Sequence, residues 1–396
     1  MLRILCFVYL CCSIALAAAE MKQAATGAND QAESSKLAIP QPRIPPGYQP
    51  IDRNTEKGLW MELEDYELSI QQSALLITDE PINAYVRNAA CRVAGEYCGD
   101  LRVYVMRNPG FNAMMTANGV MQIWTGLLVR VSSEDELAAV IGHELAHYTQ
   151  LHTLERLRRI QSNLATSSVI DLLIGLPLSQ MAAVANIMSF NREQEEEADL
   201  LGVRFMHDSG YDPRAAVRVW EMLVEEEANA AAKSEAANIF TQTHPLSEQR
   251  IQTISDFVEK NYPDAATTTP DSSSHLAILN RYYLLLMEDQ IDTNRYGRTE
   301  TMLKHHRELG VNPGLIDFFY GEMYRQRKAE GDLERARQAY ERAIQSDDTI
   351  AEAYRNLGYI QLKLDRPELA RARFRKYLEL EPDADDRAMI EFYLEE

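Results

Sequence analysis

His143-Glu144-Leu145-Ala146-His147 places two imidazoles four positions apart, with a carboxylate beside the first of them. Positions i and i+4 share one face of a helix, so both rings can reach the same metal ion. Glu144 then lies near the water that such an ion binds, an arrangement typical of zinc peptidases. The alternative is a chance match on an amphipathic helix, because five-residue patterns with two free positions recur in unrelated chains.

The surrounding sequence indicates a buried helix. Ser133 to Glu136 has the pattern of a capping box at a helix start. Apolar residues then recur at helical spacing, at Leu137, Val140, Ile141, Leu145 and Leu151. Ionisable side chains are unfavourable inside such a helix unless they are paired or bound to metal. The predicted burial therefore favours a ligand role for His143 and His147.

A catalytic zinc site has three protein ligands and one open position, so a third donor must come from elsewhere. The short metzincin extension needs Gly at 150 and His at 153, but Gln150 and Thr153 stand there. The acidic stretch 191–199 offers Glu195 as the third ligand and Asp199, one turn later, as a partner that holds a ligating ring. The alternative is a solvated acidic helix start, which suits the helix dipole.

Three ordered motifs resemble the signatures of the M48 family of zinc metallopeptidases. They are residues 143–147, Arg192-x-x-Glu195-x-Glu197-Ala198-Asp199, and Thr243-His244-Pro245-Leu246-Ser247-Glu248-Gln249-Arg250. Upstream, Asn112-Ala113 and residues 119–128 resemble the strand that leads into the family's active-site helix. The resemblance covers about residues 60–258. It implies an α+β, mostly helical, gluzincin-type metalloprotease domain with a small sheet and one Zn²⁺ per chain, bound by His143, His147 and Glu195.

The same resemblance implies the roles of four further side chains. Glu144 is the general base that takes a proton from a zinc-activated water and passes it to the leaving amine. Asp199 is the acid outside the ligand set that the family uses as a proton donor. His244, expected in an exposed turn, either stabilises the oxyanion or binds zinc in a resting, self-inhibited state. Arg250 either pairs with a carboxylate such as Asp199 or binds substrate.

Two strands are expected before the motif helix, over 101–106 and 119–125. The second can offer an edge on which an extended substrate pairs through main-chain hydrogen bonds, with Asn112 and Ala113 lining the cleft. The alternative is a plain scaffold strand.

The N-terminus resembles a secretory signal peptide over 1–19, with Arg3, an apolar stretch over 4–16 and a small-residue cleavage site near Ala19. A cleaved product is favoured over a retained anchor or a lipoprotein, because the apolar run is short and no clear lipobox precedes a cysteine. Residues 20–54, rich in Ala, Gln, Ser and Pro, are expected to be a flexible lead-in.

Only Cys91 and Cys98 remain in the mature chain, and an oxidising compartment would join them. Seven residues on one unbroken helix span about 10 Å, too far for a disulfide. A bridge therefore requires the helix to end near Gly95 or Gly99. Two free core cysteines are the alternative.

The formal net charge of −20 disfavours nucleic acid as a partner and a polybasic membrane anchor. With the signal peptide, it is consistent with a periplasmic location. The apolar stretch 162–190 is interrupted by Asp171 and Pro177, so a bilayer span is not expected. It predicts either core or lid helices or an interfacial element that contacts the outer membrane or a membrane-protein substrate.

The chain is expected to divide into a metallopeptidase domain over 55–260, a linker over 261–275 and an all-α tetratricopeptide-repeat domain over 276–396. Equivalent residues recur at a spacing of 34 in the pairs Tyr320 and Tyr354, Ala336 and Ala370, and Tyr340 and Phe374. Such an array binds partners and has no chemistry of its own.

This architecture resembles the periplasmic members of the M48 family that act in quality control of misfolded or stalled outer-membrane proteins. It implies unfolded or misassembled substrates, and contact with the outer-membrane barrel-assembly machinery through the repeats. The alternative from another class is a periplasmic chaperone or scaffold that binds partners through its repeats with little proteolysis.

Overall fold

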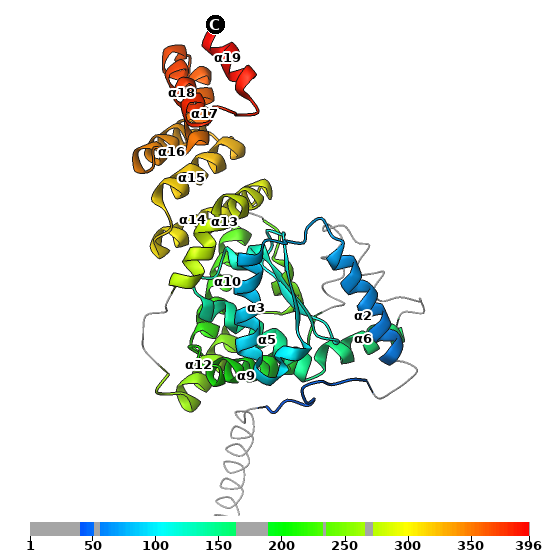
Figure 1. Ribbon diagram of the computed structural model, residues 1–396. Coiled ribbons are helices and arrows are strands. Elements are labelled where there is room, and N and C mark those ends of the chain that lie inside the picture. Colours follow the sequence, from blue (N-terminus) through cyan, green and yellow to red (C-terminus); the bar gives the residue numbers. More distant parts are fainter. Residues whose placement is uncertain (1–39, 51–55, 164–188, 233–234, 266–271, 396) are drawn as a thin grey trace, which may run out of the picture. The chain divides into compact units, whose positions relative to one another are not determined.

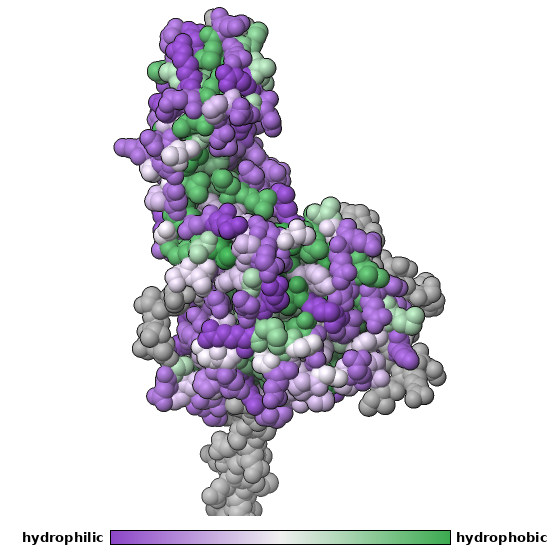
Figure 2. Space-filling model, viewed as in Figure 1, coloured by the Kyte–Doolittle hydropathy of each residue, from purple (hydrophilic) through white to green (hydrophobic). Residues whose placement is uncertain are grey.

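The computed structural model describes residues 40–50, 56–163, 189–232, 235–265 and 272–395. The expected signal peptide, most of the lead-in, the bulk of the apolar stretch 162–190 and the centre of the predicted linker lie outside the described residues. Residues 42–396 form one compact unit. No helix among the described residues is both long and apolar enough to cross a bilayer, and hydrophilic residues predominate on the face shown in Figure 2.

A small mixed sheet has the order β1-β3-β2. β1 (Arg102–Met106) runs parallel to β3 (Val120–Trp124), and β2 (Ala113–Met115) pairs with β3 in the antiparallel sense. Both predicted strands are confirmed. The expectation that the second of them forms an edge is wrong, because β3 pairs on both sides and is buried along its whole length. The edge strands are β1 and β2, and β2 carries the predicted cleft residue Ala113.

Helices surround this sheet (Figure 1). They are α2 (Glu56–Gln71), α3 (Glu80–Ala94), α4 (Thr125–Leu128), α5 (Glu134–Thr149), α6 (His152–Asn163), α9 (Arg192–Asp208), α10 (Ala215–Ala232), α11 (Ile239–Thr243) and α12 (Glu248–Asn261). α5 carries the HELAH motif and contacts α3, α9, α10 and β2. The predicted α+β, mostly helical fold is confirmed.

α5 begins where the sequence predicts. The Ser133 side chain accepts a hydrogen bond from the backbone N–H of Glu136. The Glu136 carboxylate accepts in return from the N–H of Ser132, one residue before the position that a standard capping box uses. The helix ends at Thr149, so the expectation that Leu151 continues its apolar face is wrong. Leu151 has a φ of 60°, and this left-handed residue reverses the chain into α6.

α3 ends at Ala94, and Gly95 follows with a φ of 55°, a conformation that glycine tolerates best. A 3₁₀ turn over Gly95–Asp100 then brings Cys98 back beneath Cys91. Their Cα atoms lie 4.6 Å apart and the two sulfurs are bonded. The disulfide and the helix end that it requires are therefore both confirmed.

The C-terminal region is a series of paired helices. They are α13 (Ser273–Asp292), α14 (Tyr296–Leu309), α15 (Pro313–Arg327), α16 (Asp332–Ser346), α17 (Ala351–Lys363), α18 (Pro367–Leu380) and α19 (Arg387–Glu395). α15 packs on α16, and α17 packs on α18. Tyr340 and Phe374, which stand at the repeat spacing of 34, take similar places, since each packs against a glycine of the preceding helix, Gly321 and Gly358 respectively. An all-α region is confirmed, and its assignment as tetratricopeptide repeats stays a prediction.

Buried histidines join the first of these helices to the rest of the unit. The ring of His306 on α14 contacts the Val129 carbonyl through Nε2, at 2.6 Å, and the Tyr283 hydroxyl through Nδ1, at 2.9 Å. His275 on α13 contacts the hydroxyl of Tyr85 on α3 at 3.0 Å. Burial lowers the pKa of His275 to about 4 and that of His306 to about 3, so both rings are neutral at pH 7.

α5 and α9 cross at a pair of glycines. A Cβ on Gly142 would lie 2.9 Å from the carbonyl oxygen of Gly202, and a Cβ on Gly202 would lie 2.9 Å from the backbone nitrogen of His143. Real Cβ atoms do not tolerate such distances to backbone atoms. The two helices therefore approach each other as closely as their backbones allow, directly beside the first residue of the HELAH motif.

We expect Gly202→Ala to push α9 away from α5. Overpacking of a buried contact costs about 1–3 kcal/mol, more than the roughly 1 kcal/mol that alanine contributes to a helix over glycine. Urea unfolding should show a net loss of stability, and competition with a chromogenic chelator should show weaker metal binding.

Gly58→Ala is the matched control, because Gly58 is also helical and a Cβ there meets no atom within 4 Å. This variant should be as stable as the wild type or slightly more so. Unchanged metal affinity in Gly202→Ala would contradict the idea that the close approach of α5 and α9 sets the distances between the predicted metal ligands on the two helices.

Candidate metal centre

Four buried side chains converge from three parts of the chain. His143 and His147 come from α5, Glu195 from the first turn of α9, and His244 from the residue after α11. One potential ligand atom from each lies within 4.8 Å of the other three. Each of the four residues is at most 3% exposed. The structure thus brings the three predicted ligands together and adds His244 to them.

The distances between these atoms suit a single metal ion. The Nε2 atoms of His143 and His147 are 3.1 Å apart, and Nδ1 of His244 lies 3.2 Å from His143 Nε2 and 3.0 Å from Glu195 Oε1. Glu195 Oε1 is 3.5 Å from His147 Nε2. Ligand atoms around a tetrahedral zinc with bonds of about 2.0–2.1 Å lie roughly 3.3 Å from each other.

The hydrogen-bond partners of the rings also favour a cation at this point. His143 Nδ1 lies 3.0 Å from the carboxylate of Asp199, which places its proton on that side and turns the Nε2 lone pair toward His147. Burial lowers the pKa of His147 well below its ordinary value, so this ring is neutral. A metal ion at the point that these two Nε2 atoms share would satisfy both of them in a dry site.

His147 has its own partner, which the sequence reasoning did not identify. Its Nδ1 lies 3.1 Å from Nδ1 of His152, the first residue of α6. The Nε2 of His152 lies 3.2 Å from the Glu197 carboxylate, and burial lowers the pKa of His152 to about 4. A neutral His152 that donates to Glu197 can only accept from His147, which leaves the His147 Nε2 lone pair for the metal.

The one available signal for this partner in the sequence is that His152 follows His147 by only five residues. That spacing was misleading, because on a continued helix His152 would lie beyond the next turn and point away from His147. The left-handed Leu151 breaks that helix, and only the resulting chain reversal brings the rings together. Phe190 covers the pair by stacking on His147, with ring centroids 3.8 Å apart.

Arg250, on α12, ties the acidic residues together. Its Nε and Nη2 donate to the two oxygens of Asp199, at 2.6 and 2.9 Å, and its Nη1 lies 2.6 Å from Glu195 Oε2. Burial alone would raise the pKa of Asp199, but the guanidinium lowers it. Burial also opposes ionisation of Glu195, and nearby His244 and Arg250 hold its pKa well below the ordinary value. Both carboxylates are therefore charged.

His244 does not lie in an exposed turn, so that expectation is wrong. Its ring stacks on Phe240 with centroids 4.5 Å apart, and its backbone N–H closes the turn of α11 by donating to the Phe240 carbonyl. Arg250 also donates from Nη1 to the carbonyl of the next residue, Pro245. The same guanidinium thus fixes both the carboxylates of α9 and the loop that carries the fourth donor.

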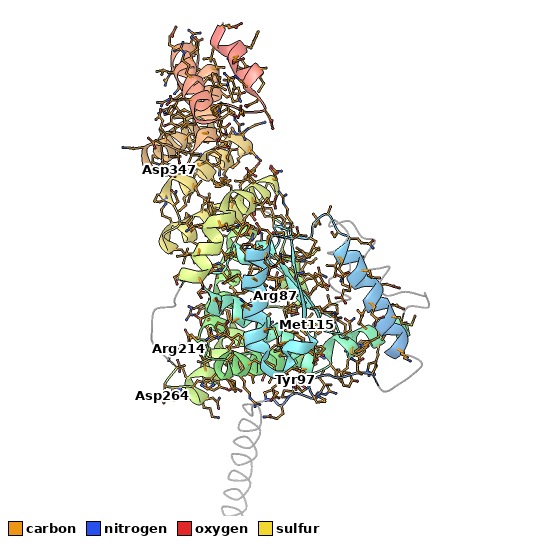
Figure 3. All side chains as sticks on the ribbon, viewed as in Figure 1. Arg87, Tyr97, Met115, Arg214, Asp264 and Asp347 are labelled. Carbon is orange, nitrogen blue, oxygen red and sulfur yellow. A yellow bond between two sulfur atoms is a disulfide. The ribbon has the colours of Figure 1, made fainter. Side chains whose placement is uncertain are left out.

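Glu144 stands beside the cluster without belonging to it. Its Oε1 is 3.5 Å from His244 Nε2, and its carboxylate accepts from the backbone N–H of Met115 on β2, which is labelled in Figure 3. Burial raises the pKa of Glu144 to about 7. A carboxylate with such a pKa can both accept and release a proton near neutral pH, as a general base requires.

Comparison with known proteins agrees with this site. Residues 77–258 match peptidase family M48. Mitochondrial metalloendopeptidase OMA1 of Schizosaccharomyces pombe is 28% identical over 214 residues, which cover 52% of this chain and 62% of that protein. Beta-barrel assembly-enhancing protease of Escherichia coli K12 is 28% identical over 211 residues, which cover 49% of this chain and 42% of that protein. The chain thus spans roughly half the length of these relatives.

The matched segment contains β1–β3, α5, α9 and all four donors of the metal cluster. The match to peptidase family M48 therefore covers the whole candidate metal centre. The chain is similar to the beta-barrel assembly-enhancing proteases and to OMA1.

We expect His152→Ala to weaken zinc binding by about 10- to 100-fold, the usual cost of removing a partner that orients a metal ligand. Competition with a chromogenic zinc chelator measures this affinity directly. His152→Gln retains a hydrogen-bond acceptor and should lose less. An unchanged affinity in both variants would show that His147 needs no support from α6.

Proposed function

We propose that this protein is a zinc-dependent endopeptidase. The observation that carries the proposal is the convergence of His143, His147, Glu195 and His244, with a buried carboxylate of raised pKa beside them. A bound zinc ion would act as a Lewis acid toward the scissile carbonyl and the attacking water. Imidazole and carboxylate donors suit zinc, and the match to the M48 family supports the same choice.

Residues of the protein itself transfer the proton, orient the metal ligands and bind the substrate backbone. Glu144 takes a proton from the attacking water and delivers it to the leaving amine. Asp199 holds His143 in the tautomer that turns Nε2 inward, and Arg250 keeps Asp199 and Glu195 ionised and in place. β2 supplies the edge beside Glu144 on which an extended segment of a substrate adds by main-chain hydrogen bonds.

His244 provides a resting state in this proposal. A catalytic zinc site keeps one position open, yet four protein donors converge here. The loop after α11 must therefore move His244 away before a substrate can bind. The contact between His244 Nε2 and Glu144 Oε1 at 3.5 Å also occupies the general base in the resting arrangement.

We further propose that the enzyme works in the periplasm on misfolded or stalled outer-membrane proteins. The disulfide between Cys91 and Cys98 supports an oxidising compartment. The likeness to beta-barrel assembly-enhancing proteases supports the substrate class. The paired helices α15 to α18 are suited to hold partners, including the barrel-assembly machinery.

Glu144→Gln should abolish cleavage without removing the metal. General-base catalysis contributes about 10²- to 10⁴-fold, so casein hydrolysis should fall by at least the lower figure. Elemental analysis should still find one zinc ion per chain, because Glu144 is not one of the donors.

Wild-type turnover in Glu144→Gln would rule out this role for the carboxylate. In cells, full rescue of a null mutant by Glu144→Gln would instead show that a scaffold function, carried by the helical region, is the main one.

His244→Ala should increase casein turnover several-fold and weaken zinc binding, because it removes the donor that closes the open position. Phe240→Leu is the informative companion, since it removes the ring that stacks on His244 and retains the donor itself. Lower activity in His244→Ala would support oxyanion stabilisation by this residue. Unchanged activity would dismiss both roles.

A further inference from the structure

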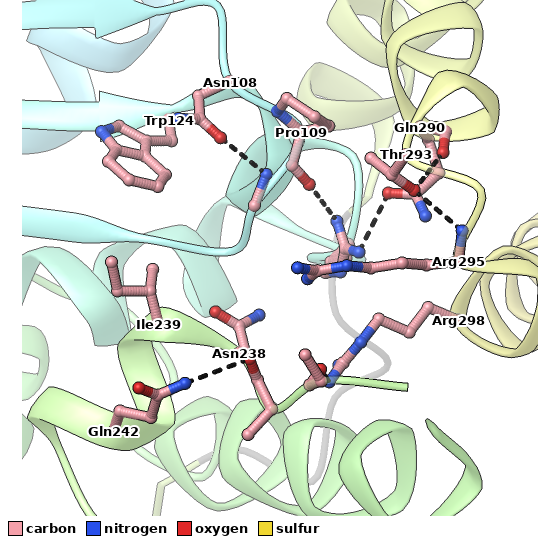
Figure 4. A pocket seen from close by; sticks show the side chains of 14 residues that line it. Asn108, Pro109, Trp124, Asn238, Ile239, Gln242, Gln290, Thr293, Arg295 and Arg298 are labelled. Atoms are coloured by element: carbon pink, nitrogen blue, oxygen red, sulfur yellow. Dashed lines mark hydrogen bonds between the residues drawn. The ribbon is translucent and has the colours of Figure 1, made fainter. Parts of the chain in front are cut away.

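A pocket of about 390 Å³ lies between the mixed sheet and the start of the C-terminal helices. One wall is formed by residues 108–110 and Trp124, a second by residues 236–239 and Gln242, and a third by the turn from α13 to α14 (Figure 4). This volume is within the range of small-ligand sites. None of the four metal donors lines the pocket, so it is separate from the metal centre.

The charges in the lining all have the same sign. Arg130, Arg295 and Arg298 contribute guanidinium groups, and no carboxylate is among the described residues of the lining. Behind them, Glu226 pairs with Arg130 at 2.8 Å and with Arg298 at 2.9 Å. This cationic lining is unusual in a chain whose net charge is −20.

Arg295 differs from the other two arginines. The donors of Arg130 are satisfied by Glu226, by Gln290 and by two backbone carbonyls. The guanidinium of Arg295 has no hydrogen bond or ion pair within the part of the chain that the structure describes, although the residue is only partly exposed. Its side chain extends from the α13–α14 turn across the pocket toward the opposite wall (Figure 4).

A second donor is also unused. Arg298 is 1% exposed, and its Nε has no partner among the described residues. Burial and the neighbouring guanidiniums of Arg298 and Arg130 lower the pKa of Arg295, and the carboxylates of Glu235 and Glu227 offset this only in part. An unpaired cation beside like charges is unfavourable, and an anion in the pocket would relieve both the repulsion and the unmet hydrogen bonds.

The rest of the lining specifies more than a bare inorganic anion. Trp124, Pro109 and Ile239 provide apolar surface, while Asn238, Gln242 and Gln290 provide amides. We propose that this pocket binds the carboxylate of an amphipathic ligand, with Arg295 as the principal contact and the apolar wall receiving a hydrophobic side chain. The carboxylate comes either from the C-terminal residue of a polypeptide or from a free small carboxylic acid.

Isothermal titration calorimetry tests the proposal on the full-length, zinc-loaded chain carrying Glu144→Gln, which prevents cleavage of the probes. Three probes are compared: N-acetyl-Ala-Ala-Leu with a free carboxylate, the same peptide as its C-terminal amide, and isocaproate. The free-acid peptide should bind at least about tenfold more tightly than the amide, since a hydrogen-bonded charged group is typically worth that much.

Arg295→Gln should weaken binding of the free acid by about tenfold or more. Arg295→Lys retains the positive charge but loses the planar guanidinium group, so its affinity for the free acid should lie between those of Arg295 and Arg295→Gln. Arg281→Gln is the matched control, because this exposed arginine of α13 lies outside the pocket. Circular dichroism and thermal unfolding verify that each variant is folded.

Binding of the free acid but not of isocaproate identifies a polypeptide C-terminus as the ligand, and equal binding of both identifies a free acid. Absence of binding by every probe would overturn the proposal, and so would equal affinities in the wild-type pocket and both Arg295 variants. Because the measurement needs no turnover and Arg295 is not one of the metal donors, its result is independent of whether the chain proves to be a peptidase.

Discussion

The crossing of α5 and α9 at Gly142 and Gly202 is the constraint on which the rest of the site depends. Neither helix carries a complete ligand set, because α5 supplies two imidazoles and α9 supplies one carboxylate. Backbone contact at the glycines brings the ligand atoms of His147 and Glu195 to within 3.5 Å of each other. A methyl group at the crossing would separate donors that lie one to two helix turns away. Small residues at a helix crossing here serve chemistry as well as packing.

The charged side chain of Arg250 then stabilises the arrangement that helix packing produces. Arg250 reaches both Asp199 and Glu195 and also binds the Pro245 carbonyl, so one guanidinium connects the third donor, the partner of the first donor and the loop of the fourth. Such a group is costly to bury unless several anions surround it. The arrangement links the position of His244 to the ionisation of the two carboxylates on α9. A movement of the His244 loop would therefore displace Arg250 and change its contacts with Asp199 and Glu195.

Buried charges are also paired where the C-terminal helices begin. Glu226 and Glu227 on α10 pair with Arg130 and Arg298, and the buried rings of His275 and His306 complete the junction with neutral hydrogen bonds. The guanidinium of Arg295 has no such partner among the described residues, and it faces a pocket with apolar walls. The junction thus combines a satisfied polar network with one unsatisfied cation, and that contrast distinguishes a ligand site from a packing contact.

Local spacing in the sequence was enough to predict the helix with two rings on one face, the capped start of α5, the break at Gly95 that permits the disulfide, and the recurrence of 34 in the paired helices. Spacing also offered Glu195 and Asp199 as candidates, and the family resemblance supported both and added Arg250. Tertiary structure alone decided that β3 is central, that His244 is buried among the donors, and that His152 supports His147. These depend on which distant segments meet and on a left-handed Leu151, and neither long-range contacts nor a single reversed residue leaves a periodic trace in the sequence.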